Sequence, residues 1–167
     1  GSAEHLRMQP LHHVYMSIIG ALIWISSCTH PHLCVVTNVL SRFSINPAEC
    51  HFAALIRVLL YLRKHPSDTL TLGGTGPDAE VLRIITDASH EDGPSLSGVF
   101  VVMGVAVIDW ICRRQKSTSR SSLESEALAN AEGAQDGVYK RELAKEFGVK
   151  VTTTDFYTDS DSSIKLH

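Results

Sequence analysis

Three acidic residues stand where apolar segments end or a helical segment begins, the places where proteins often assemble cation sites. Asp87 follows the apolar run at 84–86, and Asp159 follows the Thr-, Phe- and Tyr-rich run at 152–158. Glu126 lies early in a long Ala-rich segment. If the two runs are neighbouring strands of one sheet, Asp87 and Asp159 lie close together. A helix packed on that sheet then adds Glu126.

Such a trio of carboxylates is suited to divalent cations. The like charges repel one another, and protonation or a cation relieves the repulsion. Mg²⁺ prefers carboxylate oxygens, water and substrate phosphate, and two such ions about 4 Å apart can drive phosphodiester hydrolysis. On spacing alone a structural explanation is favoured, because Asp after a strand commonly forms a turn and Glu early in a helix complements the helix dipole.

Composition and charge limit the class of protein. The chain has 167 residues, of which 44% are apolar and 20% charged. This is ordinary globular composition, so a disordered tail, a collagen-like fibre and a coiled-coil rod are excluded. The formal net charge is −3, so any contact with nucleic acid must rest on local basic patches.

The cysteines and the apolar runs bear on the cellular compartment. No C-x-x-C pair is present, which favours buried reduced thiols in an intracellular protein over a disulfide framework. The longest apolar run, at 14–25, is too short to span a bilayer, so we expect no membrane partner. The chain has four cysteines: Cys28, Cys34, Cys50 and Cys112.

The first 70 residues have a helical period. It predicts helices over 14–27, from Pro31 to about residue 43, and from Pro47 to residue 64, the last with Asn46 as its cap. We expect both tryptophans, Trp24 and Trp110, to pack in a core. The sequence therefore predicts a helical appendage over residues 1–70.

The character changes near residue 70, after which strand patterns dominate. Runs at 81–86 and 152–158 predict strands, and runs at 97–103 and 105–112 predict a hairpin around Gly104. Residues 123–147 predict one helix, or two with Gly133 and Gly137 as break points, and 160–166 begin a further helix. The pattern indicates an α/β fold.

A basic segment separates the predicted hairpin from the predicted long helix. It has four positive charges in the eight residues 113–120. Basic and hydroxyl side chains here can contact phosphates, or the segment can be an ordinary solvated loop. The sequence leaves both interpretations open. The basic residues are Arg113, Arg114, Lys116 and Arg120.

From about residue 15 onward the chain resembles the C-terminal part of the polyprotein of copia-type LTR retrotransposons. In the first half, Y-M-S-I-I-G-A-L at 15–22 looks like the family's Y-R-S-L-I-G-S-L, and N-V-L-S-R-F at 38–43 looks like N-x-L-S-R-F. In the second half, T-D-A-S at 86–89 stands where the family has S-D-A-D. S-S-L-E-S-E-A at 121–127 resembles S-S-T-E-A-E-Y, and Y-T-D-S at 157–160 resembles Y-x-D-N.

The resemblance implies a connecting region followed by an RNase H domain. Residues 71–167 are expected to form an RNase H-like α/β fold: a mixed sheet with antiparallel hairpin strands, one parallel strand and helices packed on it. The last strand and helix of the family's domain are expected to be lacking. Residues 1–70 correspond to the segment that joins polymerase to nuclease, so the expected partners are the polymerase region or a second copy bound through this appendage.

The resemblance also implies a function and a site. The family's first three catalytic carboxylates fall on Asp87, Glu126 and Asp159, which would hold two Mg²⁺ or Mn²⁺ ions and cleave the RNA strand of an RNA/DNA hybrid. Glu126 is preferred over Glu124 as the second Glu of the signature. A hybrid is read by shape and by 2′-OH contacts. The expected contacts are the four basic residues of 113–120 together with Ser89 and Ser160.

One departure from the family motivates an alternative function. Family members have a fourth carboxylate on a later helix, a region beyond His167, so Asp161, His167 or another molecule would have to replace it. The alternative is a catalytically inactive or domesticated RNase H-like module that binds nucleic acid or a protein partner. It predicts hybrid binding with a steep salt dependence and no cleavage.

Overall fold

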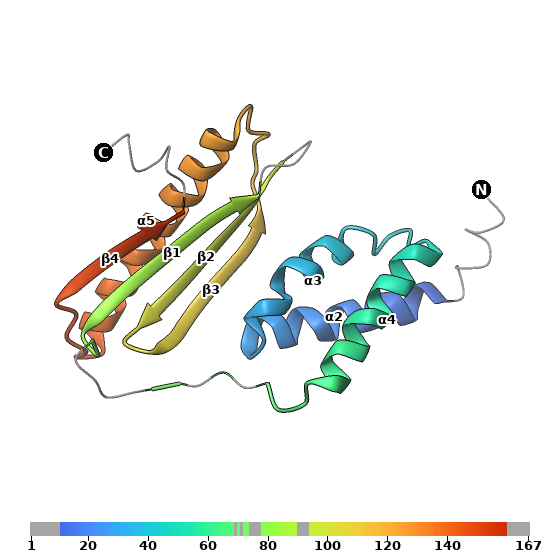
Figure 1. Ribbon diagram of the computed structural model, residues 1–167, viewed down its shortest axis with the longest axis horizontal. Helices are drawn as coiled ribbons and strands as arrows, with labels where there is room; N and C mark the ends of the chain where they lie inside the picture. Colours follow the sequence, from blue (N-terminus) through green and yellow to red (C-terminus); the bar gives the residue numbers. More distant parts are fainter. Residues whose placement is uncertain (1–10, 69, 71, 74–77, 90–93, 160–167) are drawn as a thin grey trace. The chain divides into compact units, whose positions relative to one another are not determined.

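Two compact units make up the chain, Gly1–Leu70 and Thr71–His167. Figure 1 shows the first as a group of helices and the second as a sheet with a long helix on one face. None of the helices in the described part of the chain is long and apolar enough to cross a membrane. The computed structural model describes residues 11–68, 70, 72–73, 78–89 and 94–159.

The first unit is built from α2 (His12–Cys28), a 3₁₀ turn (Pro31–Leu33), α3 (Cys34–Ser41) and α4 (Glu49–Lys64). The helices bury one apolar stripe each and meet in a shared core. At its centre the fully buried Tyr15 donates its hydroxyl to the Leu40 carbonyl at 2.8 Å, which satisfies the polar end of the ring. The buried core residues are Tyr15, Ile19, Leu22, Leu33, Leu40, Leu55 and Val58.

Three sequence predictions for this unit need correction. Helix α4 starts at Glu49 with Ala48 at the cap position, so Asn46 is not its cap. A ring nitrogen of His51 instead accepts the Ala48 N–H at 2.9 Å, which satisfies a donor from within the first turn. Trp24 is 72% exposed and lies outside the core. The thiols of Cys28 and Cys50 are likewise exposed.

The second unit has a four-stranded mixed sheet in the order β3-β2-β1-β4. Its strands are β1 (Val81–Ser89), β2 (Leu96–Met103), β3 (Ala106–Arg114) and β4 (Thr153–Thr158). The β2–β3 hairpin turns at Gly104, whose φ of +62° favours glycine. Strand β4 is parallel to β1, while β1–β2 and β2–β3 are antiparallel. This is the α/β arrangement predicted, compatible with an RNase H-like fold.

Helix α5 (Ser122–Glu146) is one continuous helix, so the two glycines do not break it. They lie against β1 instead. A Cβ at Gly133 would overlap the Thr86 methyl group, and one at Gly137 would lie 3.0 Å from Ile84 Cγ1. The glycines therefore allow the helix to approach the sheet closely. The helix that the sequence predicted over 160–166 lies outside the described residues.

Candidate metal centre

The structure brings Asp87, Glu126 and Asp159 together at one end of the sheet. Each offers a carboxylate oxygen, and these oxygens all lie within 4.8 Å of one another. Asp87 and Asp159 are exposed and Glu126 is half-buried. The three residues come from β1, α5 and the residue directly after β4, so the site joins three elements that are distant in the sequence.

Strand register accounts for the proximity of the two aspartates. In the parallel pair, Thr86 of β1 lies opposite Thr158 of β4, and each aspartate is the next residue along its strand. The prediction that Asp87 follows a strand is wrong in detail. Strand β1 continues to Ser89 because its antiparallel pairing with β2 extends to Ser89–Leu96. The two aspartates still lie side by side, since parallel strands point the same way.

The start of α5 places Glu126 and separates it from Glu124. Ser121 caps the helix, and its hydroxyl accepts the Glu124 N–H at 3.2 Å. The Glu124 carboxylate in turn accepts the Arg120 N–H at 2.7 Å. Glu124 thus belongs to the capping arrangement, while Glu126, half a turn further along, belongs to the carboxylate trio.

The electrostatics of the trio are those of like charges held close together. Burial raises the pKa of Glu126, and the neighbouring charges of Asp87 and Asp159 raise it further, while a backbone hydrogen bond from Ala88 lowers it. The Glu126 Oε2 atom is buried and has no hydrogen-bond partner among the residues that the structure describes. Three carboxylates that offer hard oxygen donors, one of them the buried Glu126 Oε2, suit Mg²⁺ or Mn²⁺. The charge of the ion would relieve the repulsion among the carboxylates.

The predicted nucleic-acid contacts are only partly free to meet a ligand. Arg113, near the end of β3, forms an ion pair with Glu132 of α5 at 3.0 Å. Arg114 closes β3, and Lys116 and Arg120 are exposed between β3 and α5. Ser89 is exposed at the end of β1, and its hydroxyl accepts the Leu96 N–H at 3.4 Å. Three further residues lie outside the described part of the chain: Ser160, Asp161 and His167.

A buried network of hydroxyl and amide groups adjoins the trio, and sequence reasoning missed it. Ser95, Ser119 and Ser125 have their Oγ atoms within hydrogen-bond distance of one another. Gln115 joins them through its backbone N–H, which donates to the Ser95 carbonyl at 2.8 Å. The segment between β3 and α5 is therefore anchored rather than simply solvated. One sequence signal for the buried face of α5 was a small residue at every fourth position. These residues are Ser125, Ala129, Gly133 and Gly137, and all four are buried.

A second charged cluster lies between α5 and β3. Lys140 pairs with Asp109 across the interface and lies 4.0 Å from Asp136 one turn earlier. Burial raises the pKa of Asp136, Lys140 lowers it, and Asp109 raises it again. Because one lysine bridges two acids here, we interpret the cluster as a packing contact and not as a cation site.

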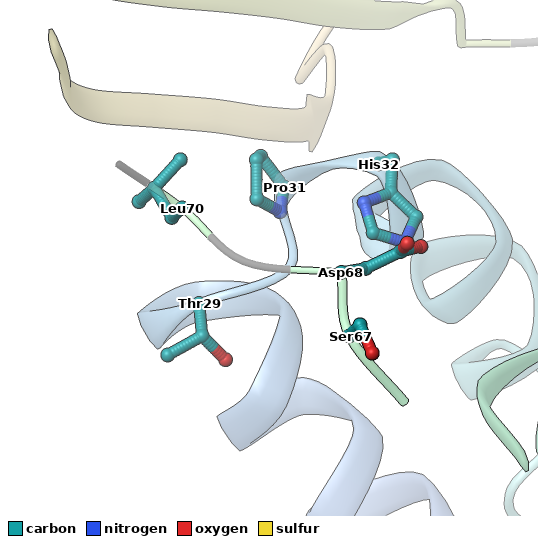
Figure 2. A pocket seen from close by; sticks show the side chains of 6 residues that line it. All are labelled: Thr29, Pro31, His32, Ser67, Asp68 and Leu70. Atoms are coloured by element: carbon teal, nitrogen blue, oxygen red, sulfur yellow. The ribbon is translucent and has the colours of Figure 1, made fainter. Parts of the chain in front are cut away.

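The first unit has an open pocket of about 420 Å³. Figure 2 shows its lining side chains, which come from the end of α2, the 3₁₀ turn and the segment after α4. Of its polar groups, Asp68 already accepts a hydrogen bond from Tyr61 at 3.3 Å. The pocket contains no residue of the trio. It is lined by Thr29, Pro31, His32, Ser67, Asp68 and Leu70.

Comparison with known proteins identifies relatives along most of the chain. It is 30% identical to the retrovirus-related Pol polyprotein from transposon TNT 1-94 of Nicotiana tabacum over 156 residues, which are 91% of this chain and 12% of that polyprotein. It is 31% identical over 144 residues to the Pol polyprotein from transposon RE1 of Arabidopsis thaliana, covering 83% of this chain and 10% of the relative.

A shorter relative is matched over nearly its whole length. The chain is 31% identical to secreted RxLR effector protein 161 of Plasmopara viticola over 129 residues, which are 75% of this chain and 89% of that protein. No protein-family model matches the chain. No solved structure matches it either.

The matches to the two transposon polyproteins, at about 30% identity over most of this chain, support an origin in a retrotransposon Pol polyprotein of the plant copia type. The chain spans only about a tenth of the length of the transposon polyproteins it matches, 12% and 10% in the two described. The coarser part of the sequence prediction, a retrotransposon Pol origin, is thereby confirmed.

Proposed function

We propose that the second unit is an RNase H-type endonuclease module that cleaves the RNA strand of RNA/DNA hybrids with two divalent metal ions. The observation that carries the proposal is the trio of carboxylates, whose oxygens lie within 4.8 Å of one another at one end of a mixed sheet. The Pol polyprotein relatives support it, because the resemblance to the copia-type polyproteins implies an RNase H domain in this part of the chain.

The roles of the residues follow from their positions. The exposed carboxylates of Asp87 and Asp159 face solvent, where water and substrate phosphate can complete the coordination. The half-buried Glu126 supplies an oxygen that has no other partner in the described part of the chain. When bound, two ions would activate a water and stabilise the departing oxygen. Lys116 and Arg120 are exposed and suited to sugar–phosphate contacts.

A cleavage assay tests the proposal. The chain is incubated with a hybrid labelled on its RNA strand, with Mg²⁺ and then with Mn²⁺. Asp87→Asn should abolish cleavage and retain hybrid binding, because it removes a metal ligand and leaves the basic residues in place. Glu124→Gln, which neutralises an acid two residues from Glu126 but outside the trio, should still cleave. Equal cleavage by Asp87→Asn and the parent would contradict the site.

The same assay separates the alternative function. A catalytically inactive module would bind the hybrid with a steep salt dependence and cleave with neither metal.

For the first unit we propose the polymerase region of the same polyprotein, or a second copy of this chain, as partner. Large side chains exposed on its helices support this, among them Trp24 at 72% and Val35 at 56%.

A further inference from the structure

Gln115 connects the sheet to the turn of α5 that carries Glu126. Its side-chain Nε2 donates to the Ser125 carbonyl oxygen at 2.8 Å and to Ser97 Oγ at 3.0 Å. The Ser125 carbonyl belongs to the peptide group whose nitrogen is that of Glu126. A single side chain at the end of β3 is therefore bonded both to β2 and to the peptide that precedes the proposed metal ligand.

We propose that Gln115 is a positioning residue for Glu126, holding that carboxylate in place to bind metal. The inference rests on the proposed function, since it concerns one ligand of the proposed metal centre. Removing a residue that hydrogen-bonds to a metal ligand and orients it typically lowers metal affinity or activity about 10- to 100-fold. Gln115 acts through the helix backbone and does not touch the metal site itself.

The orientation of the Gln115 amide supports this role. The Ser125 carbonyl can only accept, so the nitrogen and not the oxygen of the amide must face it. In that orientation the Oε1 atom is buried, and no described residue offers it a hydrogen bond. Leaving a buried acceptor unpaired costs free energy, so the two short hydrogen bonds that Nε2 donates must be what fixes the orientation of this amide.

The buried serines Ser95 and Ser119 hydrogen-bond to the same turn of α5 through Ser125. Ser125 Oγ lies 3.0 Å from Ser95 Oγ, next to the start of β2, and is also hydrogen-bonded to Ser119 from the segment before α5. Ser95, Ser119 and Gln115 are at most 5% exposed. Because water is excluded, these bonds restrict the turn strongly, and loss of the Gln115 contact should loosen it locally without unfolding the unit.

The test uses Gln115→Met in the full chain, because Met has a similar unbranched shape but no amide. Gln135→Met makes the same substitution at an exposed position of α5 and is the matched control. Amide hydrogen exchange is measured along α5, and Mg²⁺ affinity is measured by calorimetry. We expect about tenfold faster exchange at residues 125–129, no change at 143–146, and about tenfold weaker Mg²⁺ binding.

Each outcome decides the inference. Exchange and Mg²⁺ affinity equal to those of Gln135→Met would overturn it. Faster exchange with unchanged affinity would overturn it too, because Gln115 would then be purely structural. A parent chain that binds no Mg²⁺ would instead refute the proposed function and with it the ligand to be positioned. If Gln115→Met does not fold, Ser97→Ala, which removes the acceptor on β2, makes the same comparison with a smaller expected effect.

Discussion

Neutralising Glu126 should stabilise the second unit while it abolishes the proposed activity. Glu126→Gln keeps the shape of the side chain and removes two repulsions, with Asp87 and Asp159, whose oxygens lie within 4.8 Å. At that distance Coulomb's law gives about 0.9 kcal/mol per pair in bulk water and about 3.5 kcal/mol at an effective dielectric constant of 20. Both aspartates are exposed, so solvent screening favours the lower end.

The expected gain is therefore about 1–2 kcal/mol, or roughly 4–15 °C in Tm for a unit of about 100 residues. The gain depends on pH. The pKa of Glu126 is raised above its ordinary value of 4.5, so the parent loses stability as pH rises from that value through the folded-state pKa. Glu126→Gln removes this loss. Its advantage should be largest near neutral pH and vanish in acid.

Thermal unfolding at several pH values, with and without Mg²⁺, measures both effects. Mg²⁺ should raise the Tm of the parent and leave Glu126→Gln nearly unchanged, since the substitution removes one of the three proposed ligands. Glu146→Gln, an exposed acid at the far end of α5, is the control for loss of one negative charge. A lower Tm for Glu126→Gln at neutral pH, or an equal Mg²⁺ effect in both proteins, would refute the reasoning.

Three further predictions concern packing, binding and assembly. Gly133→Ala should lower Tm, because the overlap with a β1 methyl group costs about 1–3 kcal/mol and outweighs the helix propensity gained. Gly20→Ala, with nothing within 4 Å, should raise the stability of the first unit by about 0.5–1 kcal/mol; separate melting curves check both. Replacing Lys116 and Arg120 with Ala should weaken hybrid binding and flatten its dependence on salt, measured by fluorescence anisotropy in a salt series. The full chain should self-associate in light scattering and Trp24→Gln should reduce the apparent mass, whereas a monomer at high concentration would contradict assembly through the first unit.

The sequence was most informative where a regular period coincided with a buried face. The β-rich runs on either side of Gly104 predicted the β2–β3 hairpin, because the two strands are adjacent in the sequence and depend on near neighbours. The proximity of Asp87 and Asp159 was predicted only on the condition that their two strands are neighbours, and the parallel pairing of β1 with β4 meets that condition. The metal-binding and catalytic roles of these two residues stay predictions.

The sequence was least informative where distant segments decide the outcome. The sequence left open whether Gly133 and Gly137 break the helix, and the structure shows that they stand in one continuous helix where the close approach of β1 leaves no room for a side chain. The buried network around Gln115 is hard to predict because its members come from three separate segments, and only Ser125 belongs to the period of small residues in α5. Trp24 illustrates the opposite error: a large apolar residue on a helix with apolar residues on most sides need not be the one that is buried.

The parallel pairing of β1 with β4 also affects the order in which the chain can acquire its site. The hairpin and α5 can form from nearby contacts, but β4 must return to β1 across roughly 70 intervening residues, with Val81 opposite Thr153 and Thr86 opposite Thr158. Contacts of such high order form late, because the entropy of closing the loop must be overcome first. During synthesis Asp159 is the last of the three carboxylates to emerge. A nascent polyprotein would thus carry two of the three carboxylates until translation has passed this strand, and the centre would be completed only then.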